Sequence, residues 1–320
     1  MTFEEATEKY AIPIPEDLED YDKEIYREFD NMYLRSFYET FHITAEEEKR
    51  LAEKRAKFNA KTDVGESKIA VVLGGQAGAG KSSLVSDTKR KFIGMGRRIV
   101  LIDDDQYRQL YPRSDEILQE CPEYYTKLTA LGTSKITPKI LKFASENGYN
   151  FIFDGTMKNN RIIETMKTWE GYQIQVKVLA CSRLRSLASS AIRNGELQRR
   201  GKEGRYISID THDETYKGIP DTLRYLESTG LADEIRLYTR GADPLNPKLK
   251  YSSLINKKSS GDALEEWREE DEKNFLKNEA EKDCAYLESI SSELSDEERE
   301  EAHKIIDLIN AKLTEQEPEI

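Results

Sequence analysis

One stretch constrains the fold of this chain more than any other: KIAVVLGGQAGAGKSSL, which runs from Lys68 to Leu84. Its segment from Gly75 to Ser82 fits the pattern G-x-x-x-x-G-K-[ST], with an apolar run before it and a helical pattern after it. Glycines allow backbone N–H groups to turn inward around phosphate oxygens, and the helix N-terminus adds the positive end of its dipole. The stretch therefore predicts a loop that holds a nucleoside triphosphate, ATP or GTP.

The side chains at the end of this loop have separate expected roles. Lys81 is expected to reach the β- and γ-phosphates, and the Ser82 hydroxyl to ligate Mg²⁺. The predicted nucleotide-binding residues are Gly75, Gln76, Ala77, Gly78, Ala79, Gly80, Lys81, Ser82 and Ser83.

Short apolar runs alternate with helix-period stretches on both sides of the loop. This alternation is typical of an α/β fold with a mostly parallel sheet flanked by helices. The predicted strands are Lys68–Leu73, Arg98–Ile102, Asn150–Phe153, Ile174–Ala180 and Glu234–Tyr238. The predicted helices follow Ser82 and lie around Pro138–Asn147, at Leu184–Arg200 and at Asp221–Thr229.

The distribution of charge divides the chain into three parts. Residues 1–66 hold 10 basic and 18 acidic side chains, residues 67–260 hold 32 and 22, and residues 261–320 hold 7 and 21. We expect a helical N-terminal segment at 1–66, the α/β domain at 67–258 and an acidic helical tail at 259–320. The two flanks fit solvated helices, or acidic elements that lie against the basic middle.

Local patterns favour helices in both flanks. Thr44 to Glu47 has the form of a capping box, and Ser295 to Glu298 opens a second predicted helix in the tail. The N-terminal segment also carries an apolar stripe at steps of three and four residues, made of Ile25, Tyr26, Phe29, Met32, Tyr33 and Phe37.

Composition argues against several classes of protein. The sequence contains no run of 18 apolar residues, and the acidic N-terminus has no apolar core of a secretory signal. The three cysteines, Cys121, Cys181 and Cys284, are scattered and fit neither a disulfide framework nor a zinc spacing. We therefore expect a cytoplasmic protein, with delivery into another cell left open.

Acidic residues follow two of the predicted strands. Asp103, Asp104 and Asp105 end the run RRIVLIDDDQY, and Asp154 and Thr156 end FIFDGT. Ligands of open α/β sheets bind at this carboxyl edge. Phosphoryl transfer to a hydroxyl needs a carboxylate to accept the proton, so this pattern favours a kinase over a motor ATPase. Spacing alone does not choose among the three consecutive aspartates.

A basic segment further along resembles a lid. AIRNGELQRRGKEGRY carries Arg193, Arg199, Arg200 and Arg205, which could close over phosphates. For Arg199 and Arg200 a solvated helix face is the favoured interpretation. His42, His212 and His303 do not cluster, and we assign none of them to catalysis or metal binding; His212-Asp213 is expected to make a local polar contact near the lid.

The chain resembles the zeta toxins in the order of five stretches. These are GGQAGAGKSS, IDDDQYRQLYP, GYNFIFDGT, the arginines from 193 to 205 and RLYTR at 236–240. Zeta toxins are kinases of bacterial epsilon/zeta toxin–antitoxin systems, and the resemblance covers roughly residues 68–255. It implies a P-loop kinase-like fold. It also implies transfer of the γ-phosphate of ATP or GTP to the 3′-hydroxyl of the amino sugar of UDP-N-acetylglucosamine or a related UDP-sugar, with Mg²⁺.

The resemblance also assigns residues. It implies that Asp105 is the general base, and that Lys81, Arg193 and Arg205 act on the triphosphate. The implied substrate-binding residues are Asp103, Asp105, Asp154, Gly155, Thr156 and Lys158.

Two positions depart from the family pattern where the acceptor should lie. Asp154 replaces the usual Glu, and Lys158 replaces the usual Arg, giving a point charge instead of a planar fork. Two other functions therefore stay open: a kinase of the same fold acting on a dinucleotide, antibiotic or polynucleotide end, and a nucleotide-gated interaction protein with little turnover. A nucleic-acid acceptor is disfavoured because no aromatic residues are interleaved with the arginines, and no membrane partner is expected.

Regulation is the last expectation. In the family an antitoxin helix bundle blocks the nucleotide site, which implies an antitoxin protein as partner. Residues 1–66 are hypothesised to be a built-in version of that block, with a structural helical cap as the alternative. The acidic tail fits a spacer, a partner-docking element or a Glu-rich secretion signal.

Overall fold

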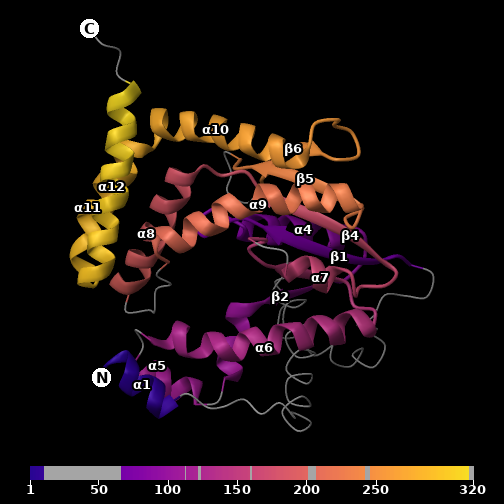
Figure 1. Cartoon of the computed structure of the whole chain (residues 1–320), viewed down its shortest axis with the longest axis horizontal. Coiled ribbons are helices and arrows are strands. Elements are labelled where there is room, and N and C mark those ends of the chain that lie inside the picture. The colour runs from indigo at the N-terminus through magenta and orange to yellow at the C-terminus, as the bar shows by residue number, and fades with distance from the viewer. Residues whose placement is uncertain are drawn as a thin grey trace, which may run out of the picture. The chain divides into compact units, whose positions relative to one another are not determined.

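The computed structural model describes residues 1–10, 66–111, 113–121, 124–158, 161–200, 207–241 and 246–316. Among the described residues, six strands form one sheet in the order β2-β3-β1-β4-β5-β6, and Figure 1 labels these strands and the helices that alternate with them along the chain. In chain order the strands are β1 (Lys68–Gly74), β2 (Val100–Asp103), β3 (Phe151–Asp154), β4 (Tyr172–Leu179), β5 (Glu234–Thr239) and β6 (Lys248–Ser252).

The sequence explains most of these strands. β1 is buried from Ile69 to Gly74, as expected for a continuous apolar strand of a parallel sheet covered on both faces. β2 pairs with β3 and β4 pairs with β5 in parallel, which confirms the predicted fold class. All five predicted strands are present. The prediction missed β6, which is antiparallel to β5 and exposes Lys248, Leu249 and Lys250 at the edge of the sheet.

The helices and 3-10 turns of the described residues are α1 (Phe3–Tyr10), α4 (Ser82–Gly94), η2 (Asp104–Leu110), α5 (Ser114–Glu120), α6 (Tyr125–Glu146), α7 (Arg161–Met166), α8 (Arg183–Arg199), α9 (Ile209–Thr229), α10 (Ser260–Asn278), α11 (Ala280–Ile290), η4 (Ser291–Glu293) and α12 (Asp296–Gln316). Two are longer than predicted, since α6 continues through Pro138 and α9 through Pro220. A proline inside a helix removes one backbone hydrogen bond, so sequence rules favour shorter helices at both places.

Contacts between residues divide the chain into two compact units. The first consists of Met1–Val72, Val85–Gly155 and Glu164–Ile174, and the second of Leu73–Leu84, Thr156–Ile163 and Gln175–Ile320.

In the first unit, the short helix α1 is packed by its apolar face. Tyr10 is fully buried, and its hydroxyl donates to Glu120 at 2.6 Å. It shares a cluster with Ala6, Tyr111, Ile117, Cys121 and Leu128. The apolar stripe and the capping box predicted between Ile25 and Glu47 lie outside the described residues.

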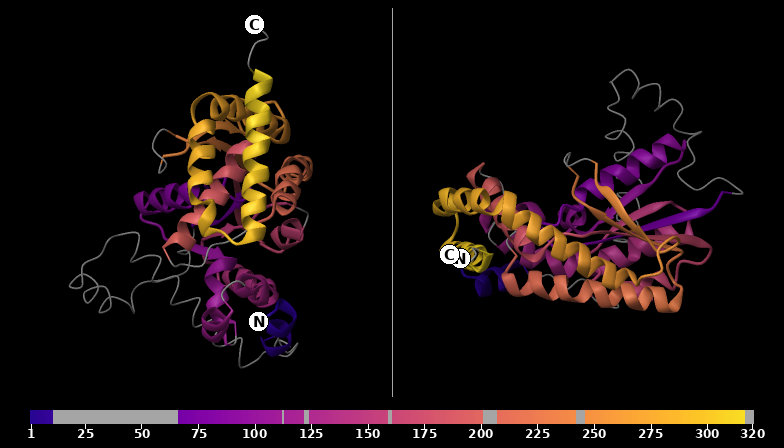
Figure 2. Two further views of the ribbon diagram at one scale, coloured as in Figure 1. Left: turned by 90° about the vertical axis from the view of Figure 1, so that its left-hand side faces the viewer. Right: turned by 90° about the horizontal axis from the view of Figure 1, so that it is seen from above.

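In the second unit, the C-terminal helices share a hydrophobic core with α8. Leu184, Leu187 and Ala188 of α8 are buried together with Phe275, Leu287, Ile290, Ile305 and Ile309 of the later helices. Figure 2 shows α11 and α12 side by side. The predicted capping box before α12 is confirmed, because Ser295 N–H donates to Glu298 at 3.0 Å and Glu298 N–H donates back to Ser295 Oγ at 3.4 Å. Residues 260–316 are therefore a packed part of the second unit.

Candidate active site

The glycine-rich loop between β1 and α4 has a backbone that requires its glycines. Gly75, Gly78 and Gly80 have φ angles of 151°, 73° and 99°, in a region that side chains strongly disfavour. Lys81 Nζ donates to Gly75 O at 3.1 Å, which folds its side chain back over the loop. The three glycines thus give the loop a backbone conformation that residues with side chains rarely adopt.

Helix α8 and the end of β5 fix this loop from outside. A Cβ on Gly78 would lie 1.9 Å from Ser186 O, so α8 approaches the loop as closely as glycine permits. Arg240, just after β5, donates to the carbonyl oxygens of Gly78 and of Ala79, the latter at 3.2 Å. Arg240 thus holds two carbonyl groups of the loop. Sequence reasoning gave Arg240 no role, although it ends the quoted RLYTR motif.

Gln76 lies in the loop, but its side chain points into the protein. It is 1% exposed, and its Nε2 donates to Cys181 O at 2.9 Å and to Ser186 Oγ at 3.0 Å. Its Oε1 accepts from Arg268 Nη2 of α10 at 3.2 Å. Gln76 can therefore contribute only backbone atoms to a bound nucleotide, and its amide links the loop to α8 and α10.

His212 makes the expected local polar contact, since its Nδ1 lies 3.3 Å from Asp213 Oδ1. Its Nε2 lies 2.8 Å from Ser186 Oγ, and Arg183 Nε donates to Asp213 at 2.7 Å. This Ser-His-Asp array is not a hydrolytic triad, because Ser186 is fully buried and its hydroxyl lies 2.7 Å from the carbonyl of Ser182. Burial lowers the pKa of His212 to about 4, so the ring is neutral at pH 7.

The segment after β3 is held in a strained conformation. Met157 is buried and has a φ of 56°, a left-handed value rare for a residue with a side chain. Its Sδ would lie 2.7 Å from a Cβ on Gly74, and a Cβ on Gly218 of α9 would lie 2.1 Å from Lys158 O. The segment therefore packs against Gly74 and Gly218 more closely than a residue with a side chain would allow. Lys158 pairs with Glu214 at 3.0 Å.

The acidic residues of the carboxyl edge lie in the first unit. Asp103 and Asp154 end β2 and β3 and are register partners. Asp105 follows in the first turn of η2, where its N–H donates to Asp103 Oδ1 at 3.1 Å and its carboxylate accepts from Arg108 Nε at 3.1 Å. The Asp104 carboxylate accepts from Thr137 of α6. The sequence has three consecutive aspartates, and the structure gives each of them a contact with a different residue.

The arginines of the predicted lid have different surroundings. Arg193 lies on α8, and Arg205 lies outside the described residues. Arg200, which directly follows α8, pairs with Glu196 at 2.6 Å and is exposed, as is Arg199 nearby, so the solvated face expected for these two is confirmed.

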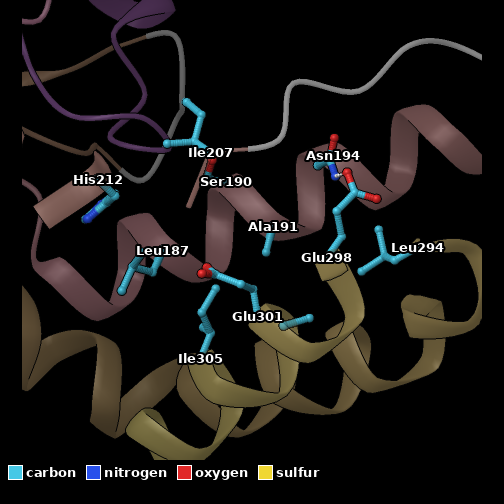
Figure 3. A pocket seen from close by; sticks show the side chains of 11 residues that line it. Leu187, Ser190, Ala191, Asn194, Ile207, His212, Leu294, Glu298, Glu301 and Ile305 are labelled. Carbon is cyan, nitrogen blue, oxygen red and sulfur yellow. Dashed lines mark hydrogen bonds between the residues drawn. The ribbon is translucent and has the colours of Figure 1, made fainter. Parts of the chain in front are cut away.

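A small pocket lies between α8 and α12 (Figure 3). Leu187 and Ala191 face Ile305 across it, and Glu298 of α12 accepts from Asn194 at 2.9 Å. The same carboxylate accepts from Gln198 at 3.0 Å. The C-terminal helices therefore hold the part of α8 that carries Arg193.

The residues expected around Mg²⁺ have suitable chemistry. Ser82 is the exposed first residue of α4, and hydroxyl and carboxylate oxygens are the protein ligands that Mg²⁺ prefers. Within the described ranges, no group of three or more His, Cys, Asp or Glu side chains could hold a metal ion by itself. In the same part of the chain, no helix is long and apolar enough to cross a bilayer.

Known proteins resemble this chain in sequence and in fold. The family model described as Zeta toxin matches residues 52–248. The chain is 28% identical over 226 residues to Toxin zeta of Enterococcus hirae, covering 67% of this chain and 78% of that protein. It is 28% identical over 203 residues to Toxin PezT of Streptococcus pneumoniae serotype 4, covering 62% and 77%. A solved structure from the PezAT chromosomal toxin–antitoxin system of Streptococcus pneumoniae has the same fold, with a TM-score of 0.55 and 24% identity over 86% of this chain and 98% of that one.

Proposed function

The chain belongs to the zeta toxin family, and on that premise we propose that it transfers the γ-phosphate of ATP or GTP to the 3′-hydroxyl of the amino sugar of UDP-N-acetylglucosamine or a related UDP-sugar. Asp105 is the general base. The observation that carries this proposal is the register pairing of Asp103 with Asp154, which gathers acceptor-binding carboxylates at one sheet edge with Asp105 two residues beyond Asp103.

The contacts of the three aspartates support Asp105 over its neighbour. Thr137 already donates to Asp104, and Asp103 uses one oxygen to cap the turn that follows. Asp105 is oriented by Arg108, a buried guanidinium that also donates to Thr129 at 2.9 Å. A base held by a second residue keeps its carboxylate in one orientation, which general base catalysis requires.

The proposed reaction is a direct displacement. Asp105 takes the proton of the acceptor hydroxyl while that oxygen forms a bond to the γ-phosphorus. The bond between the γ-phosphorus and the bridging oxygen breaks, and the nucleoside diphosphate leaves. Lys81 and Arg193, together with Arg205, neutralise the charge on the transferring group. Bound Mg²⁺, held by Ser82 and the phosphates, would supply further neutralisation.

The strained segment after β3 is the proposed sugar-nucleotide contact. Gly155, Thr156 and Lys158 surround Met157, whose left-handed backbone fixes the direction of its neighbours. The ion pair with Glu214 limits the reach of the Lys158 ammonium group. A lysine restrained in this way contacts an anionic acceptor as a point charge, without the bidentate geometry of arginine.

The experiment that tests the proposal measures transfer of labelled γ-phosphate from ATP and from GTP into a panel of UDP-sugars, NAD and DNA ends. Lys81→Ala serves as the blank. A labelled UDP-N-acetylglucosamine, with phosphate on the 3′-hydroxyl, is the expected product. Label in another acceptor alone contradicts the proposed substrate. No label in any acceptor, with intact nucleotide binding, favours a nucleotide-gated interaction protein.

We further propose that an antitoxin, or the acidic residues between positions 11 and 65, restrains this activity. The basic excess of residues 67–260 supports an acidic inhibitor. Because Tyr10 is buried in the core, the test should retain α1 and replace the Asp and Glu of residues 11–65 by Asn and Gln. Faster turnover is expected, and unchanged turnover at low salt contradicts inhibition by this segment.

A further inference from the structure

We propose that Arg268, on α10, is a positioning residue for the phosphate-binding loop and acts through Gln76. The family model ends at residue 248, twelve residues before α10 begins, so the proposal extends the nucleotide site into helices beyond it. It rests on the proposed function only for nucleotide binding by the loop, and not for the identity of the acceptor.

The guanidinium of Arg268 is held at three points. Nη1 donates to Tyr216 O at 2.8 Å, Nη2 donates to Gln76 Oε1 at 3.2 Å, and the guanidinium carbon lies 3.8 Å from the centre of the Tyr216 ring. The side chain is 2% exposed. These contacts fix the planar group in one orientation against the loop.

Within the described residues, Arg268 has two acceptors, and both are uncharged oxygens. Burying a cation without a carboxylate partner is costly, so this placement is not explained by stability alone. Burial lowers the pKa of Arg268 only to about 10, and the group stays charged at neutral pH.

The backbone of α9 supplies one of these acceptors for a specific reason. Pro220 has no N–H, so the carbonyl four residues earlier, that of Tyr216, has no helical partner at that position. Arg268 takes its place as the donor. The hydrogen bond from Arg268 to Tyr216 O therefore joins α10 to α9 at the position where Pro220 interrupts the helical hydrogen bonds.

Gln76 connects Arg268 to the loop, because its side chain bonds to Arg268 and its backbone is part of the loop. Its Nε2 has two acceptors, Cys181 O and Ser186 Oγ, and its Oε1 has the Arg268 donor. Turning the amide over would set its NH₂ group against a guanidinium. Arg268 therefore fixes the orientation of Gln76, whose own carbonyl accepts from Ala79 N–H at 3.2 Å within the loop.

The C-terminal helices are anchored independently of Arg268. Asp271 of α10 accepts from Ser182 N–H at 2.8 Å and from Arg185 Nε at 3.1 Å, at the start of α8. Glu298 of α12 accepts from Asn194 near the other end of that helix (Figure 3). Replacing Arg268 therefore leaves the helices attached to α8, which makes the loop contact testable in the full chain.

The experiment measures binding of the fluorescent nucleotide mant-ATP, and of mant-GTP, to the full-length protein. Arg268→Met keeps an unbranched side chain that fits a buried position, and it removes the charge and both donors. We expect nucleotide affinity to fall about tenfold, the fold-change of losing one charge-assisted hydrogen bond. In the transfer assay the nucleotide KM should rise in step, while the acceptor KM stays within twofold.

Leu287→Ala is the matched control, because it weakens the core of the C-terminal helices without contacting the loop. It should lower the melting temperature and leave nucleotide affinity unchanged. In a Gln76→Leu background, Arg268→Met should have little further effect on affinity.

Three outcomes overturn the inference: wild-type nucleotide affinity in Arg268→Met, an equal loss of affinity in Leu287→Ala, or a full additional loss in the Gln76→Leu background. Failure of the proposed function is distinguishable from these. A wild-type chain that binds nucleotide but labels no UDP-sugar contradicts the substrate and leaves the binding comparison valid. A wild-type chain that binds neither nucleotide contradicts both proposals.

Discussion

Asp103 and Asp154 are register partners at the ends of the adjacent parallel strands β2 and β3. Each is the last residue of its strand, so both carboxylates belong to the edge at which open α/β sheets bind ligands. Asp105 follows in the next turn and is oriented by Arg108. This relationship makes the roles of individual aspartates testable.

Asp105→Asn should abolish phosphoryl transfer and leave nucleotide binding intact. An amide cannot accept the acceptor proton, and loss of a general base lowers kcat by about 100-fold or more. Labelled transfer and mant-ATP binding, measured together, check this. Asp104→Asn is the matched control, since that side chain is engaged by Thr137, and it should retain transfer. Equal losses in both variants would rule out Asp105 as the specific base.

Gly78→Ala should prevent the loop from forming. The new Cβ would lie 1.9 Å from Ser186 O, and the backbone has a φ of 73°. We expect loss of nucleotide binding. Gly96→Ala is the control, because its φ is 70° but the space around it is open, and it should cost only about 1 kcal/mol of unfolding free energy. Normal binding by Gly78→Ala would show that α8 can move away from the loop.

Lys158→Met should raise the KM for the acceptor and leave the nucleotide KM unchanged. The ammonium group is the proposed contact to the sugar nucleotide, and its ion pair with exposed Glu214 contributes less than about 1 kcal/mol to stability. Glu214→Gln should preserve the fold while freeing the lysine. Steady-state kinetics with each substrate varied in turn provide the measurement, and a change confined to the nucleotide KM would contradict the assignment.

Stability should depend on pH through His212. Its pKa is about 4 in the folded protein, lowered by burial and by Arg183 and Arg268, and about 6.5 in an unfolded chain. Between these values the unfolded state binds more protons, so stability is lost as pH falls from about 6.5 to about 4. The pKa of Asp213, which pairs with His212, is lowered, so protonation of Asp213 reduces the free energy of unfolding only at still lower pH.

Urea unfolding at pH 7, 6, 5 and 4.5 should show this loss, on the order of 2 to 3 kcal/mol. His212→Gln keeps a polar side chain and removes the titration, so its unfolding free energy should change less over the same range. An identical slope in both proteins would assign the pH dependence to other groups.

The sequence alone determined the elements whose signals are local. The phosphate-binding loop follows from its glycine spacing, the five predicted strands from their apolar runs, and the start of α12 from the Ser295–Glu298 capping box. Each depends on residues within a few positions of one another, so the pattern is visible in the chain. Edge strand β6 was missed because its side chains are mostly exposed, which removes the apolar signal.

Only the tertiary structure decided which residues serve that loop from far away in the chain. Arg268 stands among glutamates and aspartates in the sequence and reads as part of a solvated helix, yet the fold buries it against Gln76. Likewise α9 continues through Pro220, and Arg268 donates to the Tyr216 carbonyl that the proline leaves without a helical donor. A buried charge is tolerated only where acceptors from several segments converge, and that convergence exists only after folding.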